Sequence, residues 1–106
     1  MAVFTREQDV LKPDKGGTLI GPAHGAVKGY CLGISVCDRE EYNAPGTHPD
    51  QEGFYVLEGR GMAKIGDEEF EISPGVAFLA AKGVPHTVRK LPGSPPLKLL
   101  WSHGAV

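Results

Sequence analysis

The sequence lacks the features that mark several classes of protein. No apolar run approaches the roughly 18–20 residues that a membrane-spanning helix needs. The formal net charge is only −2, so no basic excess is present to attract nucleic acid or an anionic membrane. The first residues do not combine a basic segment with an apolar stretch, and we expect no secretory signal. These absences predict a cytoplasmic protein that binds neither nucleic acid nor membrane.

Cysteine is also scarce, because Cys31 and Cys37 are the only two in the chain. Both lie in one apolar run that is typical of a strand. A separation of six strand residues spans about 20 Å, whereas a disulfide needs Cα atoms within about 7 Å. We therefore expect no bridge between them. They are interpreted as small strand residues in a reducing compartment or, alternatively, as a source of a reactive thiol facing a pocket.

Glycine and proline are plentiful, with 15 and nine residues among 106. They are dispersed between short apolar segments, which excludes collagen and low-complexity linkers. Turns at this spacing indicate a sandwich or barrel of short strands. The length fits one domain with its own core.

The pattern predicts an all-β protein with eight or nine short strands and almost no helix. Consecutive hairpins of this kind fit an antiparallel jelly roll of two sheets. Residues 1–20 are expected to form an N-terminal arm or edge strand, and residues 21–106 the barrel. Thr5 and Gln8 fit a capping box for a helix over residues 5–12, although this segment also fits an irregular arm covering a sheet edge. Strands are expected near residues 19–20, 27–36, 41–47, 54–57, 62–65, 69–72, 76–79, 86–89 and 97–102.

Three residues are candidate metal ligands, namely His48, Glu52 and His86. The first two flank a predicted turn, and the third begins a predicted strand. If these strands are neighbours, two imidazoles and a carboxylate converge. This set suits Fe(II), Mn(II), Ni(II) or Zn(II).

Two sequence motifs give the chain a family resemblance. The pattern G-x5-H-x-H-x3-E-x6-G is met at its second histidine, its glutamate and its last glycine. The pattern G-x5-P-x-G-x2-H-x3-N is met at both glycines and the histidine. The matching residues are His48, Glu52, Gly59, Gly75, Gly83 and His86. On these residues the chain resembles the cupin superfamily, in particular its small single-domain members, which implies a double-stranded β-helix barrel.

Four positions depart from these motifs: Glu40, Gly46, Ala81 and Lys90 replace a glycine, a histidine, a proline and an asparagine. The resemblance implies a metal held by three histidines and the glutamate, so Gly46 leaves one ligand missing. The remaining three still suffice for a divalent ion with an open position, or else the site has decayed. Replacement ligands are sought among Asp50, His24 and His103, although both histidines are expected to be exposed.

Tyr42 and Phe54 are expected to line the pocket mouth and contact substrate, because both share the even-numbered phase of His48 and Glu52. Lys90 is interpreted as a solvated strand-end residue or as a contact for an anionic substrate.

The resemblance implies a small metal-dependent enzyme of the dioxygenase, isomerase or lyase type, acting on a small polar metabolite. The alternative is a non-catalytic barrel that binds a sugar or organic acid at a degenerate metal site. A third possibility is an accessory protein within a homodimer. A homodimer is expected in any case, because paired barrels protect their sheet edges.

Overall fold

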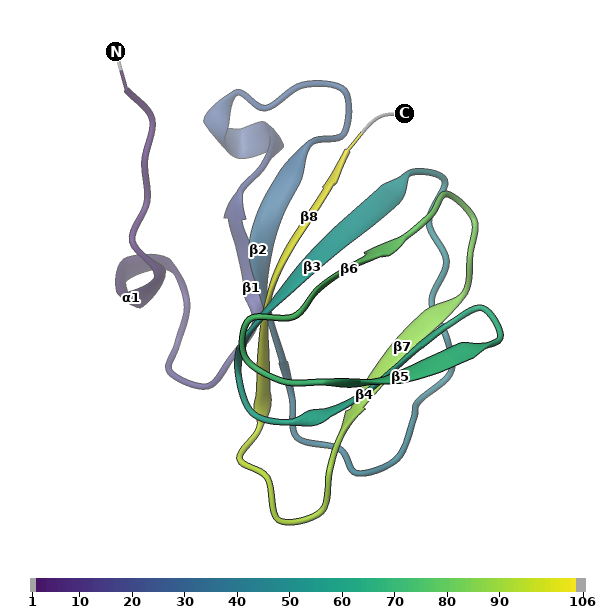
Figure 1. The fold of residues 1–106 in the computed structure, drawn as a ribbon. Coiled ribbons are helices and arrows are strands. Elements are labelled where there is room, and N and C mark those ends of the chain that lie inside the picture. Colours follow the sequence, from purple (N-terminus) through teal and green to yellow (C-terminus); the bar gives the residue numbers. More distant parts are fainter. Residues whose placement is uncertain (1, 105–106) are drawn as a thin grey trace.

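Two antiparallel sheets face each other across one apolar core (Figure 1). The computed structural model describes residues 2–104. The larger sheet has the order β1-β2-β8-β3-β6 and the smaller sheet the order β5-β4-β7. The elements are α1 (Glu7–Val10), β1 (Gly17–Ile20), the 3-10 helix η1 (Pro22–His24), β2 (Cys31–Cys37), β3 (Gln51–Glu58), β4 (Gly61–Ile65), β5 (Glu68–Ile72), β6 (Ala77–Ala80), β7 (His86–Lys90) and β8 (Leu97–Gly104). This confirms the predicted all-β jelly roll.

Strands β3 and β8 form the centre of the larger sheet and place alternate side chains on its inner face. Glu52, Phe54 and Val56 of β3 point inward, whereas Tyr55 and Leu57 are exposed on the outer face. Because the side-chain period of a strand is two, the register then fixes the inward partners on β8. These are His103 opposite Glu52, Trp101 opposite Phe54 and Leu99 opposite Val56.

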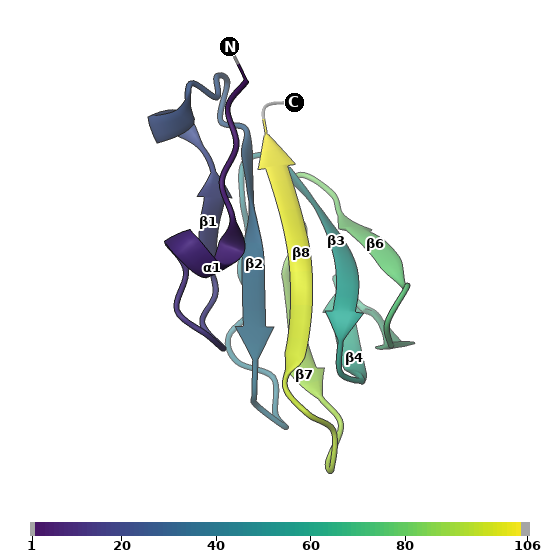
Figure 2. The same cartoon turned by 90° about the vertical axis from the view of Figure 1, so that its left-hand side faces the viewer.

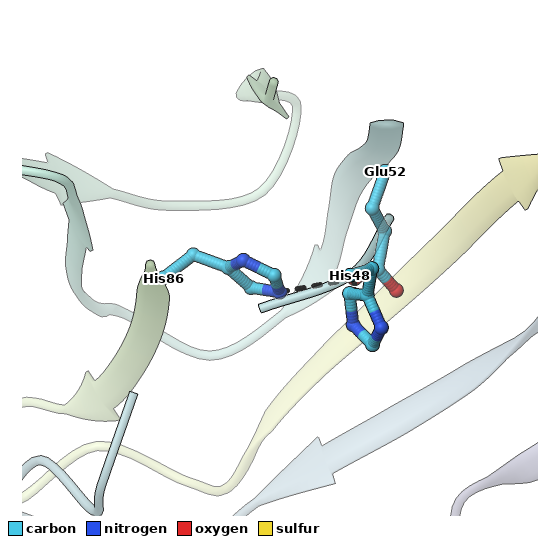
Figure 3. A group of neighbouring side chains, drawn as sticks. All are labelled: His48, Glu52 and His86. Carbon is cyan, nitrogen blue, oxygen red and sulfur yellow. Dashed lines mark hydrogen bonds and ion pairs between the residues drawn. The ribbon is translucent and has the colours of Figure 1, made fainter. Parts of the chain in front are cut away.

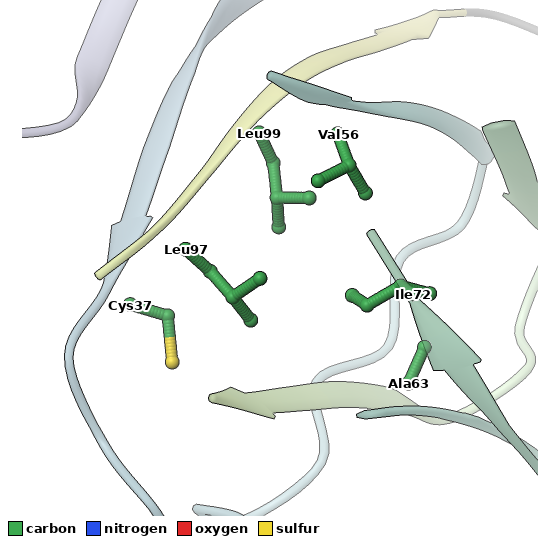
Figure 4. Packing of buried hydrophobic residues seen from close by; sticks show 6 residues of the cluster. All are labelled: Cys37, Val56, Ala63, Ile72, Leu97 and Leu99. Carbon is green, nitrogen blue, oxygen red and sulfur yellow. The ribbon is translucent and has the colours of Figure 1, made fainter. Parts of the chain in front are cut away.

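The core fills one end of the space between the sheets (Figure 4). Its buried members come from both sheets, and partly buried aromatic and aliphatic residues pack against them. The buried residues are Cys37, Val56, Ala63, Ile72, Leu97 and Leu99. Packing is therefore concentrated around the last residues of β2 and the first of β8, and the opposite end of the sandwich is left for a cavity.

Two glycines have conformations or contacts that another residue would not tolerate. Gly59 follows β3 with φ +85°, and a Cβ there would lie 2.7 Å from the Pro96 carbonyl oxygen. Gly33 lies opposite Trp101, and a Cβ there would meet the indole at 2.3 Å. Because Gly33 has no side chain, the Trp101 ring has room to lie against the inner face of the sheet.

The N-terminal residues pack on the outer side of the larger sheet (Figure 2). Glu7 of α1 pairs with Lys98 of β8 at 2.8 Å, and β1 is the edge strand beside β2. The helix is shorter than predicted and begins after Arg6, without a side-chain cap. Thr5 does not cap it, because its hydroxyl donates instead to the Leu19 carbonyl at 3.2 Å. Within residues 2–104, no helix has the length and apolar content needed to cross a membrane.

The connection from β2 to β3 differs most from expectation. The strand expected at 41–47 is absent as a regular strand, and one isolated bridge joins Gly46 to His86. The strand expected from residue 27 begins only at Cys31. Pro45 and Gly46 interrupt regular pairing, because proline lacks the amide hydrogen and glycine favours irregular backbone.

Cys31 and Cys37 lie at the two ends of β2, and both are free thiols. The prediction that they do not bridge each other is confirmed. Cys37 is buried in the core, and neither thiol lines the cavity beside Glu52 and His86.

Candidate metal centre

Three predicted ligands meet at the inner surface of the larger sheet (Figure 3). One carboxylate oxygen of Glu52, Oε1, lies 3.2 Å from Nε2 of His48 and 3.1 Å from Nε2 of His86. The three donor atoms all lie within 4.8 Å of one another. Side-chain exposure is 10% for Glu52, 13% for His86 and 41% for His48. The cluster therefore has one buried member, Glu52, and two partly buried members, of which His48 is the more exposed.

Backbone hydrogen bonds hold the irregular segment 38–50 against β7 and thereby bring His48 to His86. Gly46 and His86 exchange two bonds of 3.0 Å. The Gly83 amide donates to the His48 carbonyl at 2.9 Å, and the Lys90 amide donates to the Arg39 carbonyl at 2.7 Å. Gly83 has φ +73°, a conformation that glycine adopts readily. The second motif thus places His86 and also anchors the loop that carries His48.

The hydrogen bonds of His86 test whether a cation fits between the donor atoms. A carbonyl oxygen accepts only, so Nδ1 of His86, 3.1 Å from the Val84 oxygen, carries a hydrogen and donates it. In a neutral ring Nε2 then presents a lone pair to Oε1 of Glu52. Two lone pairs do not attract, so the arrangement requires a proton or a metal cation between them. Imidazole nitrogen and carboxylate oxygen suit Fe(II), Mn(II), Ni(II) and Zn(II).

His48 is held in place by stacked rings. Its ring lies parallel to His103, with centroids 5.6 Å apart and an interplanar angle of 6°. His103 stacks in turn on Trp101 at 5.3 Å and hydrogen-bonds through Nδ1 to Oδ2 of Asp50 at 2.9 Å. Such ring pairs stabilise by about 0.5–1.5 kcal/mol beyond the area they bury. The stack therefore helps to orient His48, whose side chain is the most exposed of the three.

The three possible replacement ligands have different surroundings. Asp50 and His103 lie beside the cluster but bind each other, and the second Asp50 oxygen, Oδ1, is buried without a partner among residues 2–104. His24 lies in η1, where its Nδ1 accepts from the Gly21 amide at 3.2 Å. His103 is only 25% exposed, contrary to expectation. The alternation of Leu97, Leu99, Trp101 and His103 along β8 is the signal that places it inside.

The missing ligand position is occupied by Gly46, and the space around it is open. A Cβ built there meets no atom within 4 Å. Gly46 and His86 form a directly opposed hydrogen-bonded pair, so side chains at these positions lie on the same face. A histidine at residue 46 would accordingly project toward the side occupied by His86.

A cavity of about 300 Å³ opens beside Glu52 and His86. Its lining combines an apolar wall with a few polar groups, and Gly46 lies at its edge. The lining residues are Ser35, Arg39, Asn43, Ala44, Gly46, Glu52, Phe54, Ile65, Phe78, His86, Thr87, Val88, Leu99 and Trp101. Its size matches a small metabolite.

Of the two predicted substrate contacts, Phe54 lines this cavity and Tyr42 does not. The Phe54 ring stacks on Phe78 at 4.8 Å. Tyr42 instead donates to Glu69 at 2.6 Å and lies under the Arg89 guanidinium, 5.3 Å from its ring centroid. Burial, followed by the hydrogen bond to Glu69, raises the pKa of Tyr42 to about 12.

Lys90, at the position of the motif asparagine, lies outside the cavity lining. Its ammonium pairs with Asp38 at 2.6 Å and donates to the Ser94 carbonyl at 3.2 Å. The hydrogen bond to Asp38 raises the pKa of Lys90 above its ordinary value. The ion pair with Asp38 neutralises the ammonium charge that would otherwise be available to an anionic substrate.

Comparisons with known proteins agree with this architecture. The sequence model of the cupin domain family matches residues 39–103, which is more than half of the chain. The uncharacterized protein MJ1618 of Methanocaldococcus jannaschii is 34% identical over 53 residues, covering 50% of this chain and 42% of that protein. The matched region thus spans less than half of its curated relative.

Solved structures with similar folds include enzymes. The polyketide cyclase RemF from Streptomyces resistomycificus has a TM-score of 0.76 and 23% identity, covering 97% of this chain and 80% of that chain. HppE, solved in its Fe(II) form with substrate, has a TM-score of 0.71 and 18% identity, covering 93% of this chain and 59% of that chain. These likenesses concern the fold. Both motifs, the two-sheet architecture and the family match lead to one conclusion: the chain belongs to the cupin family.

Proposed function

We propose that the protein is a divalent-metal-dependent enzyme of the dioxygenase, isomerase or lyase type, acting on a small polar metabolite. The convergence of three donor atoms on the wall of a metabolite-sized cavity carries this proposal. A metal-binding group beside a concave, largely apolar pocket is the arrangement expected of a catalytic site.

His48, Glu52 and His86 are the residues that would hold the ion, which is Fe, Mn, Ni or Zn. When bound, such an ion supplies Lewis acidity or activates dioxygen. The Val84 carbonyl keeps the hydrogen of His86 on Nδ1 and leaves Nε2 for the ion. The stack on His103 keeps the more exposed His48 ring oriented.

The other lining residues provide binding and shielding. Phe54, Phe78 and Trp101 form an apolar wall that would exclude water from a bound substrate. Thr87 is buried and donates to the Asn43 side-chain oxygen at 2.6 Å, which fixes the Asn43 amide at the cavity. Phe54 remains the proposed apolar contact for substrate, whereas Tyr42 has no place in this lining.

The similar structures support catalysis as a use of this scaffold. RemF is described as a polyketide cyclase, and HppE was solved with Fe(II) and its substrate. These activities belong to those proteins. Their relevance to this chain is that a protein of similar fold binds Fe(II) and a substrate.

A non-catalytic barrel that binds a sugar or organic acid is the second candidate. One observation favours it, namely that Gly46 leaves the ligand set one side chain short of the family pattern. In that case the cavity would bind its ligand without an ion, and turnover would be absent.

We further propose a cytoplasmic homodimer. The outer face of the larger sheet carries the exposed apolar residues Tyr55, Leu57 and Leu79, with exposures of 45%, 38% and 55%. Exposed apolar groups on neighbouring strands are typical of association surfaces. Light scattering is expected to give twice the mass of one chain, and a monomeric mass would contradict the dimer.

The enzyme proposal is tested by turnover. Protein reconstituted anaerobically with Fe(II), Mn(II), Ni(II) or Zn(II) is incubated with panels of hydroxy acids, oxo acids and sugars, and products and oxygen uptake are followed by NMR and an oxygen electrode. We expect turnover with at least one metal and none with the His48→Ala/His86→Ala variant. Metal-independent ligand binding without turnover would favour the second candidate.

A further inference from the structure

Arg39, an exposed residue, is the single lysine or arginine in the lining of the cavity beside Glu52 and His86. It follows β2, and its guanidinium lies 3.5 Å from the Val88 carbonyl oxygen. The only carboxylate in this lining is Glu52, which faces the two imidazoles. The cavity thus has a metal-binding end and a separate cationic side.

Arg39 and Lys90, which are joined by a backbone hydrogen bond, differ in how their charge is satisfied. Lys90 is neutralised by Asp38 at 2.6 Å. Across residues 2–104, Arg39 has no carboxylate within 4.0 Å and no aromatic ring beneath its guanidinium. Arginine offers a planar fork of donors that matches a carboxylate. Its free charge at the cavity is therefore available to an anionic ligand.

The strand geometry sets the distance between the two ends. Val88, whose carbonyl the guanidinium approaches, lies two residues along β7 from His86. Two residues of strand correspond to roughly 7 Å. A ligand that reaches both the metal-binding atoms and Arg39 therefore needs a spacer of a few carbons between its two oxygen-bearing ends.

From this arrangement we propose that the cavity takes a small dicarboxylate. One end, a carboxylate with an adjacent hydroxyl or keto oxygen, would face the ion held by the triad, and the second carboxylate would pair with Arg39. The inference rests on the proposed function and specifies its substrate class. Glu52 offsets only part of the charge of a divalent ion, and Arg39 adds another positive charge, so a dianion balances the site better than a neutral ligand. Phe54, Phe78 and Trp101 pack against the carbon chain between the two ends.

A matched pair of probes measures the contribution of the second carboxylate to the binding affinity. 2-Hydroxyglutarate and 2-hydroxypentanoate have the same carbon number and the same chelating end, and differ in the distal carboxylate. Their affinities are measured by calorimetry on the full chain loaded with Ni(II), which serves as a probe without redox chemistry, and on the metal-free chain. We expect the dicarboxylate to bind at least about tenfold more tightly to the loaded protein.

Variants of Arg39 test whether this preference comes from its guanidinium. Arg39→Gln is expected to abolish the preference, and Arg39→Lys to retain part of it, because lysine keeps the charge without the fork. Arg60→Gln is the matched control, since Arg60 pairs with Glu71 beyond the far end of β3 and does not line this cavity. Circular dichroism and Ni(II) affinity verify that each variant keeps its fold and its metal site.

The outcomes separate this inference from the proposed function. A protein that binds Ni(II) but shows equal affinity for both probes overturns the dicarboxylate site and leaves the metal proposal intact. A protein that binds no metal contradicts the proposed function, and the metal-free titration then decides the role of Arg39. An Arg39-dependent preference in that titration supports the anion site, and equal binding, or none, overturns it.

Discussion

Gly46 and His86 exchange two backbone hydrogen bonds of 3.0 Å, which places the position of the missing family ligand directly opposite a retained one. Opposed residues of this kind project to the same face. A Cβ placed on Gly46 would have no other atom within 4 Å. A side chain at residue 46 would therefore fit without displacing neighbouring atoms at its Cβ.

Gly46→His is predicted to strengthen metal binding, because the new imidazole projects from the same side as His86 into open space. Adding a ligand is expected to raise Ni(II) or Zn(II) affinity by at least about tenfold, equivalent to about 1.4 kcal/mol. Competition titration with a chromophoric chelator measures it. Gly46→Ala controls for the loss of glycine, and equal affinities in the histidine and alanine variants would contradict the prediction.

His103→Ala is predicted to weaken metal binding although His103 is outside the three-ligand set. The substitution removes the ring stacked on His48 and leaves that exposed ligand free to rotate. Loss of a stack worth about 0.5–1.5 kcal/mol corresponds to a roughly two- to tenfold weaker affinity. His103→Phe keeps the stack and is expected to restore most of the affinity. An alanine variant that matches wild type would show that the stack does not position His48.

On the inner faces of β3 and β8, the direction of each side chain could be predicted from the sequence. Glu52 and Phe54 alternate with outward residues, and both line the cavity on the inner side of the sheet. The same phase argument does not extend to Tyr42, which lies outside this lining, because residues 38–50 are not a regular strand and side-chain alternation does not apply there. The contacts that fix this segment are long-range backbone bonds to β7, which leave no periodic pattern in the sequence.

The three candidate ligands were predicted from the family motifs, because the periodicity of the sequence does not identify them. His48, Glu52 and His86 converge from a loop and two different sheets, so no local pattern predicts their meeting. His103 was expected to be exposed because it lies near the end of the chain. Its partial burial follows from the pairing of β8 with both β2 and β3, which is a property of the whole sheet.

Leu97→Ala is predicted to lower the free energy of unfolding by about 2–5 kcal/mol. Leu97 is fully buried between the sheets, so the shortened side chain leaves a cavity. Val27→Ala is the matched control, because Val27 is 71% exposed in the loop before β2 and lies outside the proposed association surface. Its effect is expected to stay within about 0.5 kcal/mol. Urea unfolding compares the two, and equal losses would show that the core is not centred where the structure puts it.

Tyr42 is predicted to make stability fall with pH in the alkaline range. Its pKa is about 12 in the folded protein, raised by burial and by the bond to Glu69, against about 10 in an unfolded chain. The unfolded state therefore releases this proton first, and the stabilisation present below pH 10 is lost as pH rises from about 10 to about 12. Tyr42→Phe is expected to show a smaller loss over the same range.

The titration of Tyr42 is followed by tyrosinate absorbance together with urea unfolding at each pH. A tyrosinate signal near pH 12 that is missing from Tyr42→Phe agrees with the prediction. An identical fall in stability for wild type and variant would contradict it.

Metal content of the purified, untagged protein tests the central claim most directly. Elemental mass spectrometry is performed on wild type and on His48→Ala/His86→Ala, before and after incubation with Fe(II), Mn(II), Ni(II) and Zn(II). The account predicts near-stoichiometric metal in the wild type and its loss in the double variant, because two of the three donor atoms are gone. Absence of metal from both proteins, persisting after incubation with all four ions, would contradict a metal centre at His48, Glu52 and His86.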